Sequence, residues 1–103
     1  MVNKAHTAVV RRILERYGGV SGDAQGVDIA ANGLLIEVET TATLAEGFAR
    51  LKELEGIRYV AITNKEAIEE ALRLVKGTGI GVMDSHGNVL QVADGHQDAA
   101  NYD

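Results

Sequence analysis

The sequence contains no cysteine, so disulfide bonds and thiolate metal sites are excluded. No apolar run approaches the roughly 18 residues that a membrane-spanning helix requires, and residues 1–7 are too polar for a signal peptide. The chain of 103 residues also lacks an internal repeat and a low-complexity linker, and its length fits one domain. We therefore expect a cytoplasmic protein without a membrane segment.

A surplus of basic residues is also missing, since the formal net charge is −5. The last ten residues hold three aspartates and no Lys or Arg, so residues 1–93 carry a net charge of only −2. We expect residues 1–93 to form the domain and residues 94–103 to form an acidic, flexible tail. Because Arg11, Arg12 and Arg16 lie close together, charge neither predicts nor excludes a nucleic-acid partner.

Hydrophobic spacing predicts an alternation of helices and strands. Apolar residues recur at helical spacing from His6 to Tyr17, and Gly18 follows the predicted helix end. Thr43 and Glu46 form a capping-box pattern at the start of a second helix. The predicted strands are residues 27–31, 34–40, 58–63, 80–84 and 89–93. Residues 20–26 form a loop or a weak, irregular edge strand, and a third helix follows Asn64. Short strand–helix–strand connections imply parallel pairing, joined to an antiparallel hairpin.

The clearest local signal is Asn32-Gly33, because both residues tolerate the positive φ of a two-residue type I′ turn. Such a turn places Asp28 opposite Glu37 in a pair without ladder hydrogen bonds, and strand alternation puts Glu39 on the same face. The opposite face is uniformly apolar: Val27, Ile29, Ala31, Leu34, Ile36 and Val38. We expect the apolar face to pack on the core while the other face gathers the carboxylates.

Carboxylates placed side by side repel each other, and the repulsion grows where water is excluded. A divalent cation, a bound proton or a nearby Lys or Arg would offset that repulsion. Oxygen ligands that converge from adjacent strands suit Mg²⁺, which takes few protein carboxylates and keeps water at its other positions. The simpler interpretation is a solvated strand face, on which the carboxylates point at water.

The element order, with Asp28 on one strand and Glu37-Val38-Glu39 on the next, resembles the PD-(D/E)XK nuclease superfamily. Gly22-Asp23-Ala24-Gln25-Gly26-Val27-Asp28-Ile29 resembles the Gly-Asp-x-Gly-x-Asp run of Mrr-type restriction endonucleases. Asp28-Ile29 with Leu35-Ile36-Glu37 resembles archaeal Holliday-junction resolvases. The resemblance covers residues 5–63. It implies an α/β fold with a restriction-endonuclease-like αβββαβ core, a mixed sheet flanked by helices, and an added helix and C-terminal β-hairpin.

The resemblance also implies a catalytic site in which Asp28, Glu37 and Glu39 hold Mg²⁺ or Mn²⁺. Glu39 stands where the family usually has Lys, and a Glu there could act as a base or as a ligand of a second metal. In other members the Lys has moved onto the next helix. Lys52 is the candidate for that role here, with Arg50 behind it.

His6 is a further catalytic candidate, because it matches the position of a metal-binding Glu in resolvase-like members. It also lies on the inward stripe of the first predicted helix. Glu15 matches that Glu by type, but it lies nine residues away, about half a turn round the helix on the charged face. Asp23 could assist the site or serve only as a turn residue.

The resemblance predicts a metal-dependent DNA endonuclease. We expect a homodimer, since cutting both strands needs two sites, and a larger DNA-processing partner could add specificity. The missing motif Lys and the negative charge favour a second class, a catalytically inactive relative that binds nucleic acid or protein. A third interpretation is a generic α/β ligand-binding domain with a wet acidic face. Divalent-metal binding that depends on Asp28 distinguishes the three.

Overall fold

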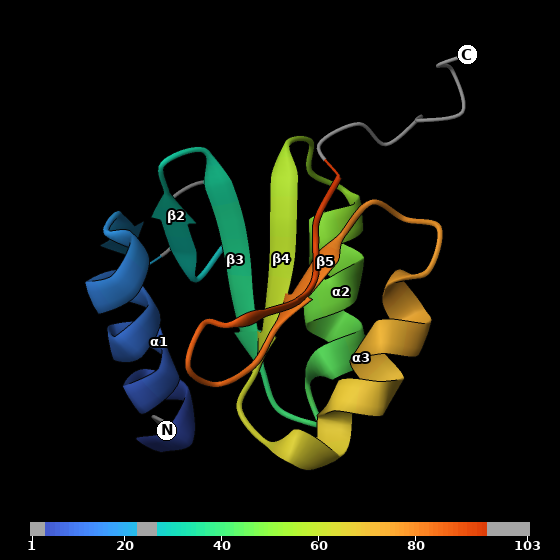
Figure 1. The fold of residues 1–103 in the computed structure, drawn as a ribbon, viewed down its shortest axis with the longest axis horizontal. Coiled ribbons are helices and arrows are strands. Elements are labelled where there is room, and N and C mark those ends of the chain that lie inside the picture. Colours follow the sequence, from blue (N-terminus) through green and yellow to red (C-terminus); the bar gives the residue numbers. More distant parts are fainter. Residues whose placement is uncertain (1–3, 23–26, 95–103) are drawn as a thin grey trace.

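One mixed sheet of six strands, in the order β1-β2-β3-β4-β5-β6, forms the centre of the computed structural model (Figure 1). The structure describes residues 4–22 and 27–94. The elements are α1 (Lys4–Tyr17), β1 (Val20–Ser21), β2 (Ile29–Ala31), β3 (Leu34–Glu39), α2 (Leu44–Lys52), β4 (Ile57–Ile62), the 3₁₀ helix η2 (Lys65–Ala67), α3 (Ile68–Val75), β5 (Gly81–Met83) and β6 (Val89–Gln91). Strand β4 runs parallel to β3 and β5, and the other neighbours pair antiparallel. The expected α/β class and mixed sheet are confirmed.

The Asn32-Gly33 turn joins β2 to β3 as predicted. Asn32 has a φ of 49° and Gly33 a φ of 86°, the positive values that a type I′ turn requires at both central residues. Ile29 pairs with Ile36, which is the register that a two-residue turn imposes. The Asn32 side chain also donates from Nδ2 to the Tyr17 carbonyl oxygen at 2.8 Å, which ties the turn to the end of α1.

Helices cover both faces of the sheet, with α1 on one side and α2 and α3 on the other (Figure 1). The core on the α1 side consists of Val9, Ile13, Ile29, Ala31, Ile36, Val38, Tyr59, Ala61 and Met83. The core on the α2 and α3 side consists of Val27, Leu35, Leu44, Leu51, Val60, Ile62, Ala67, Ala71, Val75, Ile80 and Val82. Strands covered on both faces are buried along nearly their whole length, as β3 and β4 are. The interpretation of the acidic face as solvated is wrong, since Glu37 and Glu39 are 2% and 3% exposed.

Strand β2 is shorter than predicted and begins at Ile29. Asp28 precedes it, and its carboxylate accepts a hydrogen bond from the Val38 N–H at 2.8 Å. Val27, predicted on the same face as Ile29, belongs to the core cluster on the opposite side of the sheet. The predicted alternation fails here because the Asp28 side chain takes an N–H that a longer ladder would use, and the chain leaves the strand at that point.

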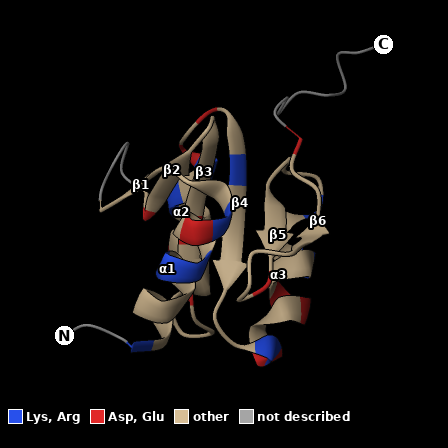
Figure 2. Ribbon diagram, turned by 60° about the vertical axis from the view of Figure 1, so that its left-hand side comes forward, with Lys and Arg blue, Asp and Glu red and all other residues tan. Residues whose placement is uncertain are grey.

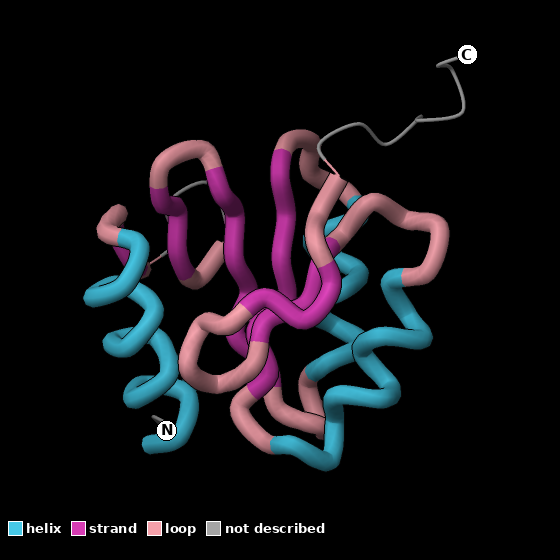
Figure 3. Tube along the Cα trace, viewed as in Figure 1, coloured by secondary structure: helices cyan, strands magenta, loops and turns pink. Residues whose placement is uncertain are grey.

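The turn between β5 and β6 reaches across to α1 (Figure 3). The Tyr17 hydroxyl donates to the Gly87 carbonyl oxygen at 2.6 Å, and Arg16 Nη1 donates to Asn88 Oδ1 at 2.6 Å. Arg12 donates to a backbone carbonyl of the same turn. Arg12 and Arg16, two residues of the predicted basic cluster, therefore hold the C-terminal hairpin against α1.

Arg58 of β4 is 2% exposed and fixes the ends of two helices. Its Nη1 donates to the carbonyl oxygens of Leu51 and Leu54 at 3.0 Å each, and its Nη2 donates to that of Thr78 at 3.3 Å. These carbonyls lie at the end of α2 and just after α3, and the Leu51 carbonyl oxygen also accepts the Leu54 N–H at 3.0 Å. Burial lowers the pKa of the guanidinium, but the surrounding carbonyl dipoles supply acceptors for its charge. Arg58 thus sets the position of α2 on the sheet.

No helix in residues 4–22 or 27–94 is long and apolar enough to cross a membrane. The predicted acidic tail lies outside the described residues except for Asp94, whose N–H donates to the Gly79 carbonyl oxygen at 2.8 Å. Asp23 also lies outside the described residues.

Replacing Arg58 with leucine is expected to lower the free energy of unfolding by about 2–4 kcal/mol, because carbonyl oxygens at both helix ends lose the guanidinium as a donor. Urea denaturation measures the loss. The control is Arg73→Leu, whose side chain is 68% exposed and pairs with Glu70. That change is expected to cost less than about 1 kcal/mol. Equal losses in the two variants would contradict the role assigned to Arg58.

Candidate metal centre

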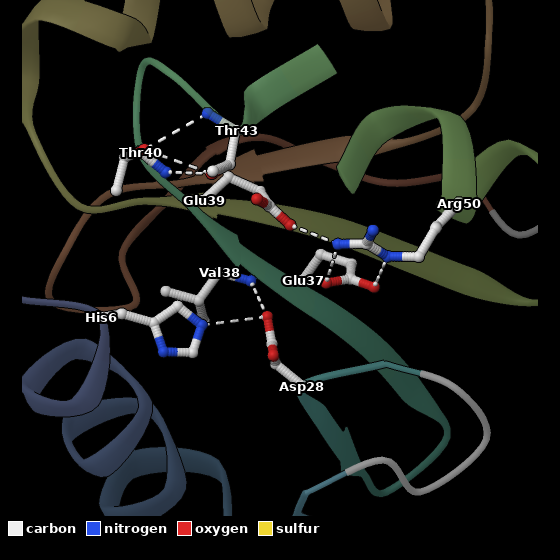
Figure 4. A network of polar contacts seen from close by, with 8 residues as sticks. All are labelled: His6, Asp28, Glu37, Val38, Glu39, Thr40, Thr43 and Arg50. Atoms are coloured by element: carbon white, nitrogen blue, oxygen red, sulfur yellow. Dashed lines mark hydrogen bonds and ion pairs between the residues drawn. The ribbon is translucent and has the colours of Figure 1, made fainter. Parts of the chain in front are cut away.

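Asp28 stands where β2 and β3 part, and it joins the hairpin to α1. Its Oδ2 accepts the Val38 N–H and lies 3.3 Å from Nε2 of His6, in the first turns of α1 (Figure 4). The side chains of Asp28 and His6 are 28% and 34% exposed, so this part of the cluster is open to water. Helix α1 therefore brings His6 to the predicted site, while Glu15 is exposed on the same helix.

Glu37 and Glu39 project from β3 toward α2, on the face that also packs against α3. Alternation along the strand places both on one side, as the sequence predicts. One carboxylate oxygen of each lies within 4.8 Å of the other and of an Asp28 oxygen. The structure thus brings together the three carboxylates expected to form the site.

Arg50 of α2 is the cation closest to the two glutamates. Its Nε lies 3.0 Å from Oε2 of Glu37, and its Nη2 lies 3.3 Å from Oε2 of Glu39 (Figure 4). Lys52 points elsewhere, and its Nζ lies over the Phe48 ring, 5.6 Å from the centroid. Residues two apart on a helix differ by about 200° in direction, so α2 cannot present both cations to one cluster. Arg50, which the sequence analysis placed behind Lys52, is therefore the residue of this pair that contacts the glutamates.

Gly47 allows α2 to lie directly against the Glu39 side chain. A Cβ added at Gly47 would overlap with the Oε2, Cδ and Cγ atoms of Glu39. Glycine in a helix interior ordinarily lowers helix stability by about 1 kcal/mol relative to alanine, so its presence here reflects the close approach. Sequence analysis missed Gly47, although an isolated glycine between the apolar positions of a predicted helix signals such a contact.

The predicted capping box at the start of α2 does not form. Thr43 makes no side-chain capping bond to the helix, and its Oγ1 instead accepts the Thr40 N–H at 2.9 Å. The Thr43 N–H in turn points to Oγ1 of Thr40 at 3.3 Å. This reciprocal pair turns the chain sharply after β3 and leads α2 back over the glutamates that β3 has just presented.

Burial sets the charge state of the cluster. It raises the pKa of Glu37 to about 8, with Asp28 and Glu39 adding to the rise and the hydrogen bonds from Arg50 opposing it. Burial also raises the pKa of Glu39, against the opposing effects of Thr43, Glu37 and Arg50. The glutamates in turn raise the pKa of Arg50, which keeps its guanidinium charged. A single guanidinium does not neutralise three carboxylates, so Glu37 holds a proton at neutral pH.

All the potential ligand atoms of the cluster are carboxylate oxygens, the donors that hard divalent cations prefer. Glu37 and Glu39 line the buried side, whereas Asp28, His6 and the half-exposed Arg50 border the solvent. The cluster could therefore hold a metal ion that remains accessible from one side.

Comparisons with models of protein families, with curated protein sequences and with solved structures give no match to this chain.

Replacing a helical glycine with alanine usually stabilises a protein, but the close contact between Gly47 and Glu39 predicts the opposite effect here. Gly47→Ala is expected to lower the free energy of unfolding by about 1–3 kcal/mol, because the added methyl displaces a buried carboxylate. In a Glu39→Ala background the same change should raise stability by about 1 kcal/mol, as alanine normally does in a helix. A double-mutant cycle by urea denaturation measures both values. Stabilisation by Gly47→Ala in the wild-type background would show that the contact is absent.

The raised pKa of Glu37 predicts that stability without metal falls as pH rises. Between the ordinary glutamate value of 4.5 and about 8, the folded state binds a proton that the unfolded state has lost. The extra stability is full below pH 4.5 and is lost as pH rises through 8, at a slope of up to about 1.4 kcal/mol per pH unit.

Urea denaturation in EDTA across this pH range measures the decline, and Glu37→Gln should make it shallower, leaving the part that comes from Glu39. A wild-type profile that is flat, or that matches the variant, would show that Glu37 titrates normally.

Proposed function

We propose that this chain is a restriction-endonuclease-like, metal-dependent phosphodiesterase that cleaves DNA, with Asp28, Glu37 and Glu39 holding Mg²⁺ or Mn²⁺. The observation that carries the proposal is the convergence of three carboxylates, two of them buried, around one protein guanidinium. Removing two carboxylates from water is unfavourable unless cations compensate their charge. Once a metal ion displaces the proton of Glu37, the cluster has the charge and the donors to hold that ion.

The order of elements supports this proposal. Helix α1 precedes three antiparallel strands, and α2 then crosses to β4, which runs parallel to β3. That order corresponds to the αβββαβ core implied by the resemblance, with α3 and the β5–β6 hairpin as additions. Asp28 directly precedes β2, and Glu37-Val38-Glu39 lie on the adjoining strand β3, which is compatible with the spacing of the motif acids in the superfamily.

The dimensions of the cluster are also compatible with Mg²⁺. An octahedral ion with ligands at about 2.1 Å holds their oxygens roughly 3–4 Å apart. The oxygens here lie within 4.8 Å of one another, so small side-chain rotations would bring them to that spacing. Such a rotation requires Arg50 to give up its hydrogen bonds to the glutamates, and its side chain, which is 51% exposed, can then turn toward solvent.

A bound divalent ion would supply Lewis-acid stabilisation of the charge that develops on a phosphoryl oxygen. Glu39, whose pKa is raised by burial, would accept the proton of the attacking water. Arg50 would pair with the phosphate once it leaves the glutamates, taking the place of the Lys that the motif lacks. His6 would hold Asp28 in position through Nε2. The half-exposed side, bordered by His6, Asp28 and Arg50, is where a phosphodiester would enter.

An inactive relative that binds nucleic acid or protein is the second candidate, and one observation favours it. Arg50 already pairs with both buried glutamates, so the cluster has an internal counter-ion and could serve only to hold α2 on the sheet. In that case the missing motif Lys marks a lost activity. A larger DNA-processing partner would then supply the chemistry.

A cleavage assay with Mg²⁺ or Mn²⁺ on duplex, single-stranded, flap and four-way-junction DNA tests the proposal. Wild-type protein is expected to cut at least one of these substrates, and EDTA should stop the cutting. Asp28→Ala should lower the rate at least about 100-fold, because a ligand oxygen is lost. Glu15→Ala, a change of carboxylate on the exposed face of α1, should leave the rate unchanged.

Cutting that survives both EDTA and Asp28→Ala would point to a contaminating enzyme and contradict the assignment. Wild-type protein that cuts none of the substrates would overturn the nuclease proposal in favour of the inactive relative.

A further inference from the structure

Helix α1 is basic, although the chain as a whole is acidic. The helix holds four basic residues and one acidic residue, which gives it a net charge of +3, and Figure 2 shows its Lys and Arg positions in blue. Residues 27–94 hold six basic and eleven acidic residues, which gives them a net charge of −5 with histidine counted as neutral. The described part of the molecule is therefore polarised, with α1 at its positive side.

Two arginines of α1 are held by the turn between β5 and β6. Arg12 and Arg16 are four residues apart, so they lie side by side on the helix, and both are exposed. Nη1 of Arg12 donates to the Ser85 carbonyl oxygen at 3.1 Å. Nη1 of Arg16 donates to the His86 carbonyl oxygen at 3.2 Å and to Asn88 Oδ1 at 2.6 Å. These acceptors are uncharged, so the turn positions both guanidiniums and neutralises neither.

The charges of the two arginines also lack a counter-ion. No Lys or Arg of α1 forms an ion pair within residues 4–22 and 27–94, whereas Arg50 and Arg73 each pair with a glutamate. Like charges four residues apart on a helix repel each other and destabilise it. A negatively charged partner that contacts both Arg12 and Arg16 would relieve that repulsion.

The unused donors of these guanidiniums suit a phosphate. A guanidinium has five N–H donors, and within the described residues Arg12 and Arg16 use only Nη1. Nε and Nη2 remain, and together they form the fork that binds two oxygens of a phosphate. The guanidinium carbon of Arg16 lies over the Tyr17 ring, 5.5 Å from its centroid, which further fixes the direction of that fork.

The surroundings of the pair favour the backbone of a double helix over other anions. Helices that bind membrane surfaces combine basic residues with large apolar ones, and proteins that bind single strands stack bases on exposed aromatic rings. Within the described residues the exposed large hydrophobic side chains include no aromatic residue and none from α1: Val20, Ile57, Val89, Leu90 and Val92. Duplex backbone is recognised by charge and hydrogen bonds alone, which this surface provides.

Helix α1 connects the arginine pair to the candidate metal centre. His6 lies against Asp28, and Arg12 and Arg16 follow His6 by six and ten residues. At about 1.5 Å per residue, they lie about 9 and 15 Å farther along the helix axis. One strand of a duplex advances about 3.4 Å per nucleotide, so these offsets correspond to roughly three to four nucleotides. One bound duplex is long enough to reach both places.

We propose that Arg12 and Arg16, held by the β5–β6 turn, form a phosphate-binding surface for duplex DNA that is separate from the metal centre. Each guanidinium contacts one backbone phosphate through Nε and Nη2, and these contacts carry no sequence preference. The acidic remainder of the chain turns α1 toward the DNA during approach. The choice of DNA rests on the proposed function, but the surface does not require cleavage, and an inactive relative that binds nucleic acid would use it too.

Fluorescence anisotropy with a labelled duplex of about 20 base pairs, in EDTA, tests this surface without cleavage. Wild-type protein is expected to bind, with the logarithm of the association constant falling linearly as the logarithm of the salt concentration rises. Arg12→Gln/Arg16→Gln should bind at least about tenfold more weakly at about 50 mM salt. The salt slope should become shallower by about 2, because two phosphate contacts are lost.

Charge-preserving and charge-matched variants separate DNA contact from a purely structural role. Arg12→Lys/Arg16→Lys should keep the wild-type salt slope, whereas a role confined to holding the hairpin predicts that the lysine and glutamine pairs behave alike. Arg73→Gln/Lys76→Gln removes the same charge from exposed positions at the C-terminal end of α3, and should leave the affinity within about threefold of wild type. Circular dichroism checks each fold. If the glutamine pair does not fold, Arg12→Gln replaces it, with an expected slope change of about 1.

Wild-type protein that does not bind the duplex at about 50 mM salt would overturn the proposal. Tighter binding to single-stranded DNA or to phosphatidylserine vesicles would overturn it in favour of those partners. Equal affinity of the wild type and the glutamine pair, or equal losses in the glutamine pair and the α3 control, would overturn it as well. Because EDTA is present throughout, duplex binding can be found where no DNA is cut, and cutting can be found where this surface does not bind. Failure of this proposal is therefore distinguishable from failure of the proposed function.

Discussion

Two glutamates buried side by side on β3 require compensation of their charge, and much of the surrounding structure follows from that requirement. Arg50 supplies one positive charge from α2, and a raised pKa lets Glu37 keep a proton. Helix α2 must lie close for Arg50 to reach both carboxylates, and Gly47 removes the side chain that would prevent it. The Thr40–Thr43 pair turns the chain back over β3, and Arg58 holds the far end of the helix. These contacts hold α2 against the acidic cluster, where Arg50 reaches both glutamates.

The separation of β2 and β3 at Asp28 has a corresponding role on the other side of the cluster. An ordinary hairpin ladder would bond Val38 to backbone atoms and leave Asp28 as one more side chain on the sheet. The Asp28 carboxylate instead takes the Val38 N–H itself, and His6 lies against the same oxygen. The acid is thereby held by a strand and a helix. It remains partly exposed, so the cluster meets water on the side of Asp28.

The sequence carried enough information to predict the sheet, the hairpin register and the grouping of Asp28, Glu37 and Glu39, because each depends on local chemistry. Asn32-Gly33 fixes the turn, and the alternation of side chains then fixes which residues share a face. Even His6 could be placed, from its position on the inward stripe of α1.

What the sequence did not predict depends on long-range packing. The burial of Glu37 and Glu39 follows from helices on both faces of the sheet, which no local pattern around them reveals. Which of Arg50 and Lys52 faces the glutamates depends on the rotation of α2 about its axis. The contact of Gly47 with Glu39 and the hydrogen bonds of Arg58 to the end of the helix fix that rotation. Val27 changes sides because one side-chain hydrogen bond ends the β2 ladder. The predicted capping box does not form because Oγ1 of Thr43 accepts the Thr40 N–H instead of an N–H of the helix.

The most direct test of the central claim is a calorimetric titration of Mn²⁺ into the wild-type chain, Asp28→Ala and Arg50→Ala, with Lys52→Ala as the control on the same helix. If the three carboxylates form a divalent-metal site, wild-type protein binds Mn²⁺ and Asp28→Ala binds it at least about tenfold more weakly. Arg50→Ala should bind it more tightly, because the internal counter-ion no longer competes, and Lys52→Ala should match the wild type. Absence of Mn²⁺ binding in both wild type and Arg50→Ala would contradict the claim, and would leave the cluster as a buried ion pair that fastens α2 to the sheet.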